Sequence, residues 1–186
     1  MLSESDRTTL LVIARAAIVA AANDQPPPTL NLDSLSPALH EPHATFITLN
    51  IGHELRGCVG GLYASQPLAL DVQEHARSAA LHDPRFPPVE PAEVPQLHIE
   101  VSVLTPPEPV SPTSPEELLR LLRPNIDGVI LVSGQRRSTF LPQVWETVPD
   151  PVKFLTMLSE KMGASPNAWR LPTTEVYRYQ VEIFEE

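Results

Sequence analysis

Cysteine is almost absent from the sequence, since Cys58 is the only one among 186 residues. A single thiol excludes an intrachain disulfide, and a thiol that stays free is typical of a reducing compartment. We therefore expect a cytoplasmic protein. The six histidines show no HxH or HExxH spacing. No local motif thus supplies the convergent ligands that zinc needs, and no metal site is predicted.

Positive charge is scarce as well, because 13 Lys and Arg stand against 23 Asp and Glu, for a formal net charge of −10. A surface this acidic repels a phosphate backbone unless its few arginines cluster, so we expect no nucleic-acid partner. Long apolar runs are missing too. The stretch 10–22 is too short for a bilayer and contains Arg15, and Glu4 and Asp6 stand where a signal peptide would be positive. We expect neither a membrane segment nor a secretion signal.

What the sequence does contain is enough apolar material, 42% of its residues, to bury a sizeable core. Its length favours a single domain over 1–186, with room for a small subdomain and without an independent second domain. Capping residues and helical periodicity predict helices that begin near Ser3, Pro67, Ser114 and Asp150. Alternation predicts strands over 45–49, 55–59, 97–103, 129–132, 139–141 and 177–183. Hairpins mixed with separate helices predict an α+β fold with a largely antiparallel sheet flanked by helices.

The segment 55–61, with the sequence LRGCVGG, is the predicted functional centre. Side chains alternate in an extended strand, so Arg56 and Cys58 are expected on the same side. A fixed positive charge beside a thiol favours the thiolate, which is the nucleophilic and metal-binding form. His53, just before the strand, is the candidate base, although it can equally be a turn residue. The alternative interpretation is that Cys58 is a small buried hydrophobe in an apolar strand.

The same segment contains three glycines, Gly57, Gly60 and Gly61, which weaken a strand and therefore need a reason. Close approach of a ligand is one reason, and a β-bulge is another. The helix that begins near Pro67 has free N–H groups at its start, which could hold an anion beside this strand.

Downstream, Asp83 and Arg85 flank Pro84, which restrains the backbone and presents both side chains in fixed directions. Two interpretations stay open for this pair, a ligand contact and a salt-bridged surface corner. On the preceding helix, Asp71 and His75 are expected on a solvated face.

Five groups of residues follow one another in a characteristic order: FITL at 46–49, LRGCVG at 55–60, DPRFPP at 83–88, VSVL at 101–104, and DG at 127–128 followed by LPQV at 141–144. Together they resemble the AMMECR-type domain family, found in eukaryotic proteins and in prokaryotic proteins called AmmeMemoRadiSam system protein A. The resemblance covers about 10–184. It implies a compact α+β domain with an antiparallel sheet, surrounding helices and a smaller subdomain.

The resemblance does not imply a reaction, because the molecular function of the family is unsettled. Its Arg-Gly-Cys motif is suspected to be functional, and prokaryotic members are associated with a Memo-like protein and a radical-SAM protein. In this sequence the resemblance implies a functional role for Arg56, Gly57 and Cys58, and less strongly for Asp83 and Arg85. No cofactor is expected for this chain itself, since an iron–sulfur cluster would belong to the radical-SAM partner.

Two hypotheses from different classes follow. In the first, the strand lines a pocket for a small anionic molecule, with Cys58 as nucleophile, Arg56 favouring its thiolate or binding the substrate, and His53 as base. The residues assigned to binding are Gly57, Gly60, Asp83 and Arg85. In the second, the chain is a noncatalytic binding or scaffold module that docks on its Memo-like or radical-SAM partners, and the LRGC strand is structural.

Overall fold

The N-terminal helix, α1 (Glu4–Ala22), begins where the sequence predicts, because Ser3 and Asp6 form a capping box. The side chain of each residue accepts the backbone N–H of the other. Six apolar residues at helical spacing make its buried face: Leu10, Ile13, Ala14, Ala17, Ile18 and Ala21. The second helix, α2 (Leu68–Leu81), packs beside α1, and alanines on its buried face let the two helices approach closely.

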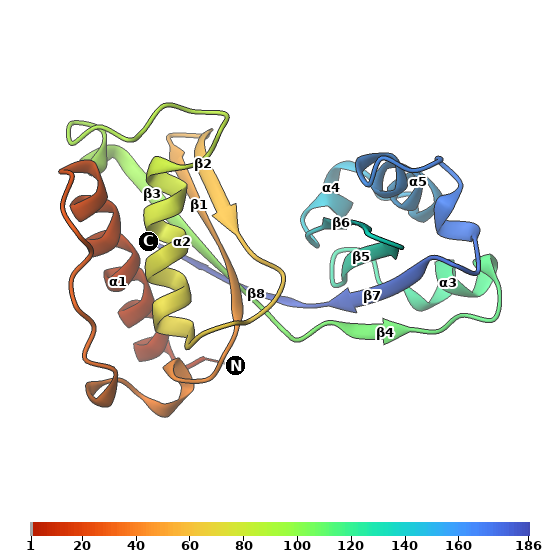
Figure 1. The fold of residues 1–186 in the computed structure, drawn as a ribbon, viewed down its shortest axis with the longest axis horizontal. Coiled ribbons are helices and arrows are strands. Elements are labelled where there is room, and N and C mark those ends of the chain that lie inside the picture. The colour runs from red at the N-terminus through yellow and green to blue at the C-terminus, as the bar shows by residue number, and fades with distance from the viewer. Residues whose placement is uncertain (1) are drawn as a thin grey trace. The chain divides into compact units, whose positions relative to one another are not determined.

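The computed structural model describes residues 2–186, which divide into two units, each with its own hydrophobic core (Figure 1). The first unit comprises residues 2–106 and 182–186, and the second unit, the smaller one, comprises residues 107–181. The chain thus leaves the first unit, builds the second, and returns for its last strand. The expectation of a single domain without an independent second one stays a prediction.

The first unit contains a four-stranded sheet in the order β2 (Glu54–Gly60), β1 (Ala44–Ile51), β3 (Leu97–Leu104) and β8 (Val181–Glu185). β1 runs antiparallel to both β2 and β3. The face covered by α1 and α2 carries Ile47, Leu49, Ile99 and Val101, which are fully buried in one cluster with the helices (Figure 1). The opposite face of the sheet therefore carries the alternate residues, among them Thr48.

β2 does not pair evenly along its length. Leu49 is opposite Gly57, whereas the next residue of β1, Asn50, is opposite Leu55. Arg56 is therefore an extra residue, as in a β-bulge, and the alternation of side chains is interrupted there.

The second unit has a sheet in the order β4 (Glu108–Val110), β7 (Glu175–Tyr179), β5 (Gly128–Ser133) and β6 (Arg136–Phe140), with antiparallel pairs throughout. Its α-helices are α3 (Pro115–Leu121), α4 (Val144–Thr147) and α5 (Pro151–Lys161). Trp145 stacks on Phe154 in its core, with ring centroids 3.6 Å apart. Short 3-10 helices complete the chain: η1 (Leu32–Ser34), η2 (Pro37–Leu39), η3 (Val94–Gln96) and η4 (Ala168–Arg170).

The α+β class is confirmed, but the last strand is not the single element that the pattern predicts. Alternation runs on from 177 to 183, whereas β7 ends at Tyr179 and β8 begins at Val181 in the other sheet. Local alternation cannot show which sheet a residue joins, since it reports only that one side is buried. Within residues 2–186, no helix combines the length and apolar character needed to cross a bilayer.

Candidate functional site

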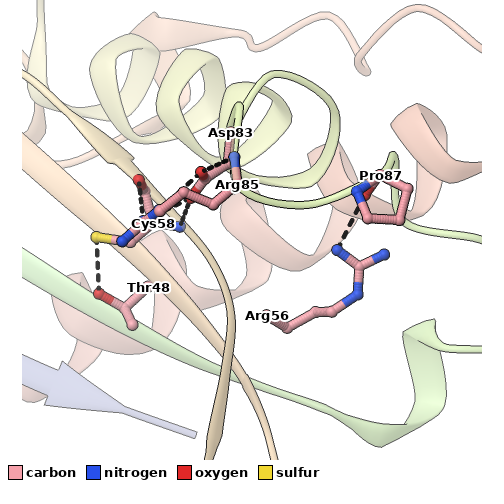
Figure 2. Close-up of polar contacts among 6 residues, drawn as sticks. All are labelled: Thr48, Arg56, Cys58, Asp83, Arg85 and Pro87. Carbon is pink, nitrogen blue, oxygen red and sulfur yellow. Dashed lines mark hydrogen bonds and ion pairs between the residues drawn. The ribbon is translucent and has the colours of Figure 1, made fainter.

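The outer edge of β2 is closed by the loop that follows α2. The Cys58 N–H donates to Asp83 Oδ2 over 2.8 Å, and the Cys58 carbonyl accepts from Arg85 Nη2 over 3.4 Å (Figure 2). β2 is the last strand of its sheet, and such a strand otherwise presents unpaired N–H and C=O groups. The LRGC and DPRF segments therefore form one hydrogen-bonded unit.

Asp83 is the centre of this unit. The residue is 4% exposed, and its carboxylate accepts from the backbone N–H, Nε and Nη2 of Arg85 at 3.0, 2.9 and 2.6 Å. The side-chain hydrogen bonds from Arg85 hold the pKa of Asp83 well below its ordinary value, against the effect of burial, and the Cys58 N–H adds to them. In return, the hydrogen bond to Asp83 raises the pKa of Arg85. Arg85 also donates to the Cys58 carbonyl, so its guanidinium lies beside the backbone of the cysteine residue.

Arg56 does not take the position expected for it beside Cys58. Its guanidinium donates to both carboxylate oxygens of Glu93, at 2.7 and 2.9 Å, and to the carbonyls of Pro87 and Pro88, at 3.0 and 3.2 Å. Figure 2 shows its side chain directed to Pro87, away from Cys58. The hydrogen bond to Glu93 raises the pKa of Arg56. The prediction that Arg56 and Cys58 share a side is wrong, because the bulge at Arg56 breaks the alternation.

Two of the glycines make room for backbone. A Cβ on Gly57 would lie 2.4 Å from the carbonyl oxygen of Ala79 in α2, and a Cβ on Gly60 would lie 2.3 Å from that of Thr45 in β1. The ligand expected at these positions would have to occupy space that the helix and the neighbouring strand already fill. Gly61 is different, since a Cβ there would meet only the His75 ring, at 3.6 Å.

His53 lies in the exposed turn between β1 and β2, next to Gly52, whose φ of 61° is the left-handed value such a tight turn needs. Cys58 is five residues further along β2. At about 3.3 Å per residue, the two residues are roughly 15 Å apart, too far for proton transfer between them. The structure does not bring the expected base to the thiol.

The Cys58 thiol points to the sheet face opposite the helices, because its neighbour Gly57 faces α2. Thr48 Oγ1 donates to Cys58 Sγ over 3.4 Å (Figure 2). Thr48 is the cross-strand partner of Cys58 on one side and of Glu100 on the other. A thiol, a hydroxyl and a carboxyl therefore form a row across three strands.

Glu100, at the end of this row, has a raised pKa. Burial is the main cause, the negative charge of Glu185 adds to it, and a hydrogen bond with Ser102 opposes it. The ionised form of Glu100 is therefore disfavoured at this position. Sequence reasoning missed the row because it depends on the register of β2, β1 and β3, and only the alternation around Glu100 hinted at its side.

A second polar group lies on the helix-covered side, where Asp71 and His75 of α2 meet Thr45 of β1. The Thr45 hydroxyl donates to Asp71 Oδ2 over 2.7 Å, and His75 Nδ1 lies 3.1 Å from the same oxygen. Asp71 is only 2% exposed, so the expectation of a solvated helix face is wrong for this pair. Their spacing of four residues was the available signal, since it places both side chains on one face of the helix. Among residues 2–186 no group of three or more His, Cys, Asp or Glu could hold a metal ion.

The fold and site define a two-unit α+β protein in which a loop closes the edge of a cysteine-bearing strand. Residues 11–184 match the AMMECR1 family. The chain belongs to that family, as the resemblance implied.

Similar proteins occur in archaea. A protein from Methanothermobacter thermautotrophicus is 41% identical over 187 residues, covering 100% of this chain and 96% of that protein. Protein MJ0810 from Methanocaldococcus jannaschii is 38% identical over 158 residues, covering 83% of this chain and 79% of that protein. The crystal structure of the uncharacterized protein PH0010 from Pyrococcus horikoshii superimposes with a TM-score of 0.90 at 34% identity, covering 100% of this chain and 93% of that one.

Proposed function

We propose that the face of β2 bearing Cys58 binds a small anionic molecule and acts on it through the thiol. The observation that carries the proposal is that the other motif residues hold the loop, the strand edge and the helix in place, while the thiol lies on the open face of the sheet beside a hydroxyl. Arg56 donates to a loop carbonyl, and Asp83 accepts the backbone N–H of Cys58 at the strand edge. Gly57 leaves room for the close approach of α2. The Cys58 thiol contacts the hydroxyl of Thr48, on the face that the helices leave uncovered.

The roles in this proposal differ from those expected from the sequence. Arg85 replaces Arg56 as the cation that attracts the anion, since its side chain is 55% exposed and it donates to the Cys58 carbonyl. Glu100 does not take over the role of His53 as base, because it lies two strands from Cys58, roughly 10 Å across the sheet, and the Thr48 hydroxyl between them donates to Cys58 Sγ. A free, half-buried thiol suits a reducing compartment, so a cytoplasmic location is part of the proposal.

Alkylation tests this proposal directly, because Cys58 is the only cysteine and mass spectrometry therefore reads one site. The folded protein is treated with iodoacetate, which is anionic, and with iodoacetamide, which is neutral. In Arg85→Gln the preference for iodoacetate should fall by roughly threefold, the scale of a half-exposed charge interaction. Arg77→Gln is the matched control, since Arg77 donates to Gln25 on another part of the unit and should change nothing.

The influence of the Glu100 charge on the thiol is tested with Glu100→Gln under the same conditions. Near neutral pH this variant should react with iodoacetamide at the wild-type rate or faster, because the carboxylate is too far away to take the thiol proton and its negative charge disfavours the thiolate. An unreactive thiol in the folded protein, or an iodoacetate preference that Arg85→Gln leaves unchanged, would contradict the thiol proposal.

A second candidate function is a noncatalytic module that binds Memo-like and radical-SAM proteins. It is favoured by the hydrogen bonds that join the two motif segments, since they build a defined surface without any chemistry at the thiol. In that case Cys58→Ser should still capture a Memo-like or radical-SAM protein of the same system in a pull-down, whereas Asp83→Ala should not. Loss of capture with Cys58→Ser would count against this alternative.

A further inference from the structure

The second unit contains a cavity of about 490 Å³, separate in sequence from the thiol site. It is bounded by β4 and the segment that follows it, by η4 and by β7. Its apolar lining includes Val110, Leu118, Trp169, Leu171 and Val176. Its size and mixed lining are those of small-molecule sites, which combine apolar walls with a few polar groups.

Trp169, which lines this cavity, has a buried side-chain donor without a partner among the described residues. The residue is 3% exposed, and its Nε1–H has no hydrogen-bond partner in the part of the chain that the structure describes. The other tryptophan is satisfied, because Trp145 Nε1 donates to the Asp127 carbonyl over 2.7 Å. A buried donor without an acceptor costs free energy, so an acceptor supplied from outside the chain would be favourable.

Arg170 supplies a cation at the same place. Its guanidinium lies over the Trp169 ring, 4.1 Å from the centroid. It is the one Lys or Arg among the cavity-lining residues, while the single carboxylate there, Glu175, accepts the hydroxyl of Tyr177 over 2.6 Å. A guanidinium stacked on an aromatic ring keeps its N–H groups free in the plane, where they match a carboxylate.

We propose that this cavity binds a small carboxylic acid with an apolar body. The carboxylate pairs with Arg170 and supplies an acceptor for the Trp169 Nε1–H, and the apolar body lies against Leu118 and Val176. This site goes beyond the proposed function, since all of its residues lie in the second unit and none takes part in the thiol chemistry.

Nuclear magnetic resonance tests the site with phenylacetate as the probe and phenylacetamide as its uncharged counterpart. Phenylacetate should shift the indole N–H signal of Trp169 saturably and leave that of Trp145 in place, which makes Trp145 an internal control. Arg170→Gln should weaken the binding about tenfold or more, because a charge-assisted hydrogen bond is lost, and Arg120→Gln, outside the cavity, should not. A Trp169 signal that does not respond, or equal responses to acid and amide, would overturn the proposal, as would unchanged binding in Arg170→Gln.

Discussion

At the scale of single residues, Asp83 connects the two motif segments of the chain. One carboxylate accepts the N–H of Cys58 and three N–H groups of Arg85. Sequence reasoning left open whether Asp83 and Arg85 form a ligand contact or a salt-bridged corner. The geometry adds a further role, since the ion pair also closes the edge of a strand.

Replacing this carboxylate should be costly. We expect Asp83→Asn to lower the free energy of unfolding by about 1–3 kcal/mol near neutral pH, because a buried charge-assisted network loses its acceptor charge. The measurement is urea denaturation, with the exposed Asp33→Asn as the matched control.

The acid dependence of this difference follows from the lowered pKa of Asp83. A depressed folded-state pKa contributes stability above the unfolded value of 3.8, and that stability is lost as the pH falls below it. The gap between wild type and Asp83→Asn should therefore narrow below about pH 4. A gap that stays constant down to about pH 2 would refute this account.

Replacing Glu100 should change the free energy of unfolding in the opposite direction to replacing Asp83. Its pKa is raised in the folded protein, so the ionised carboxylate destabilises the fold above that pKa, and the penalty disappears below the unfolded value of 4.5. Glu100→Gln should therefore be more stable than the wild type near neutral pH and equal to it in acid. Thermal unfolding over a pH series measures the difference, and a variant less stable at neutral pH would contradict the assignment of burial as the cause.

At the scale of elements, the contact between β2 and α2 explains a glycine that looked functional. A Cβ on Gly57 would come within 2.4 Å of a helix carbonyl, whereas a Cβ on Gly61 would make an ordinary contact at 3.6 Å. We expect Gly57→Ala to destabilise the protein by about 1–3 kcal/mol through overpacking, and Gly61→Ala to be close to neutral. Circular dichroism melts of the two variants compare them directly, and similar melting temperatures would show that α2 can yield.

Helix ends are the elements that sequence reasoning placed best. Ser3, Ser114 and Asp150 each accept the N–H three residues on, as capping residues do. The bulge at Arg56 could not be predicted in this way. It is a mismatch in the pairing of two strands, and the sequence of either strand alone does not indicate it.

At the scale of the whole molecule, each unit carries its own core. Phe154 and Trp145 are central to the second, and Ile47, Leu49 and Val101 belong to the first. Phe154→Ala should remove about 3–5 kcal/mol of packing from the second unit. In hydrogen exchange read by mass spectrometry, protection should fall mainly over 107–181, and an equal fall over β1 and β3 would show that the two cores unfold together.

The sequence by itself determined the α+β class, the positions of the main helices, the first hairpin and the family. These depend on local periodicity and capping, which involve residues three or four positions apart and can therefore be recognised from neighbouring residues in the sequence. Only the tertiary structure decided that Arg85 and not Arg56 accompanies Cys58, that Thr48 and Glu100 stand in its row, and that Asp71 is buried. The physical reason is that register, bulges and helix–sheet contacts join residues distant in the chain, and a shift of one residue in register reverses the side on which every side chain lies.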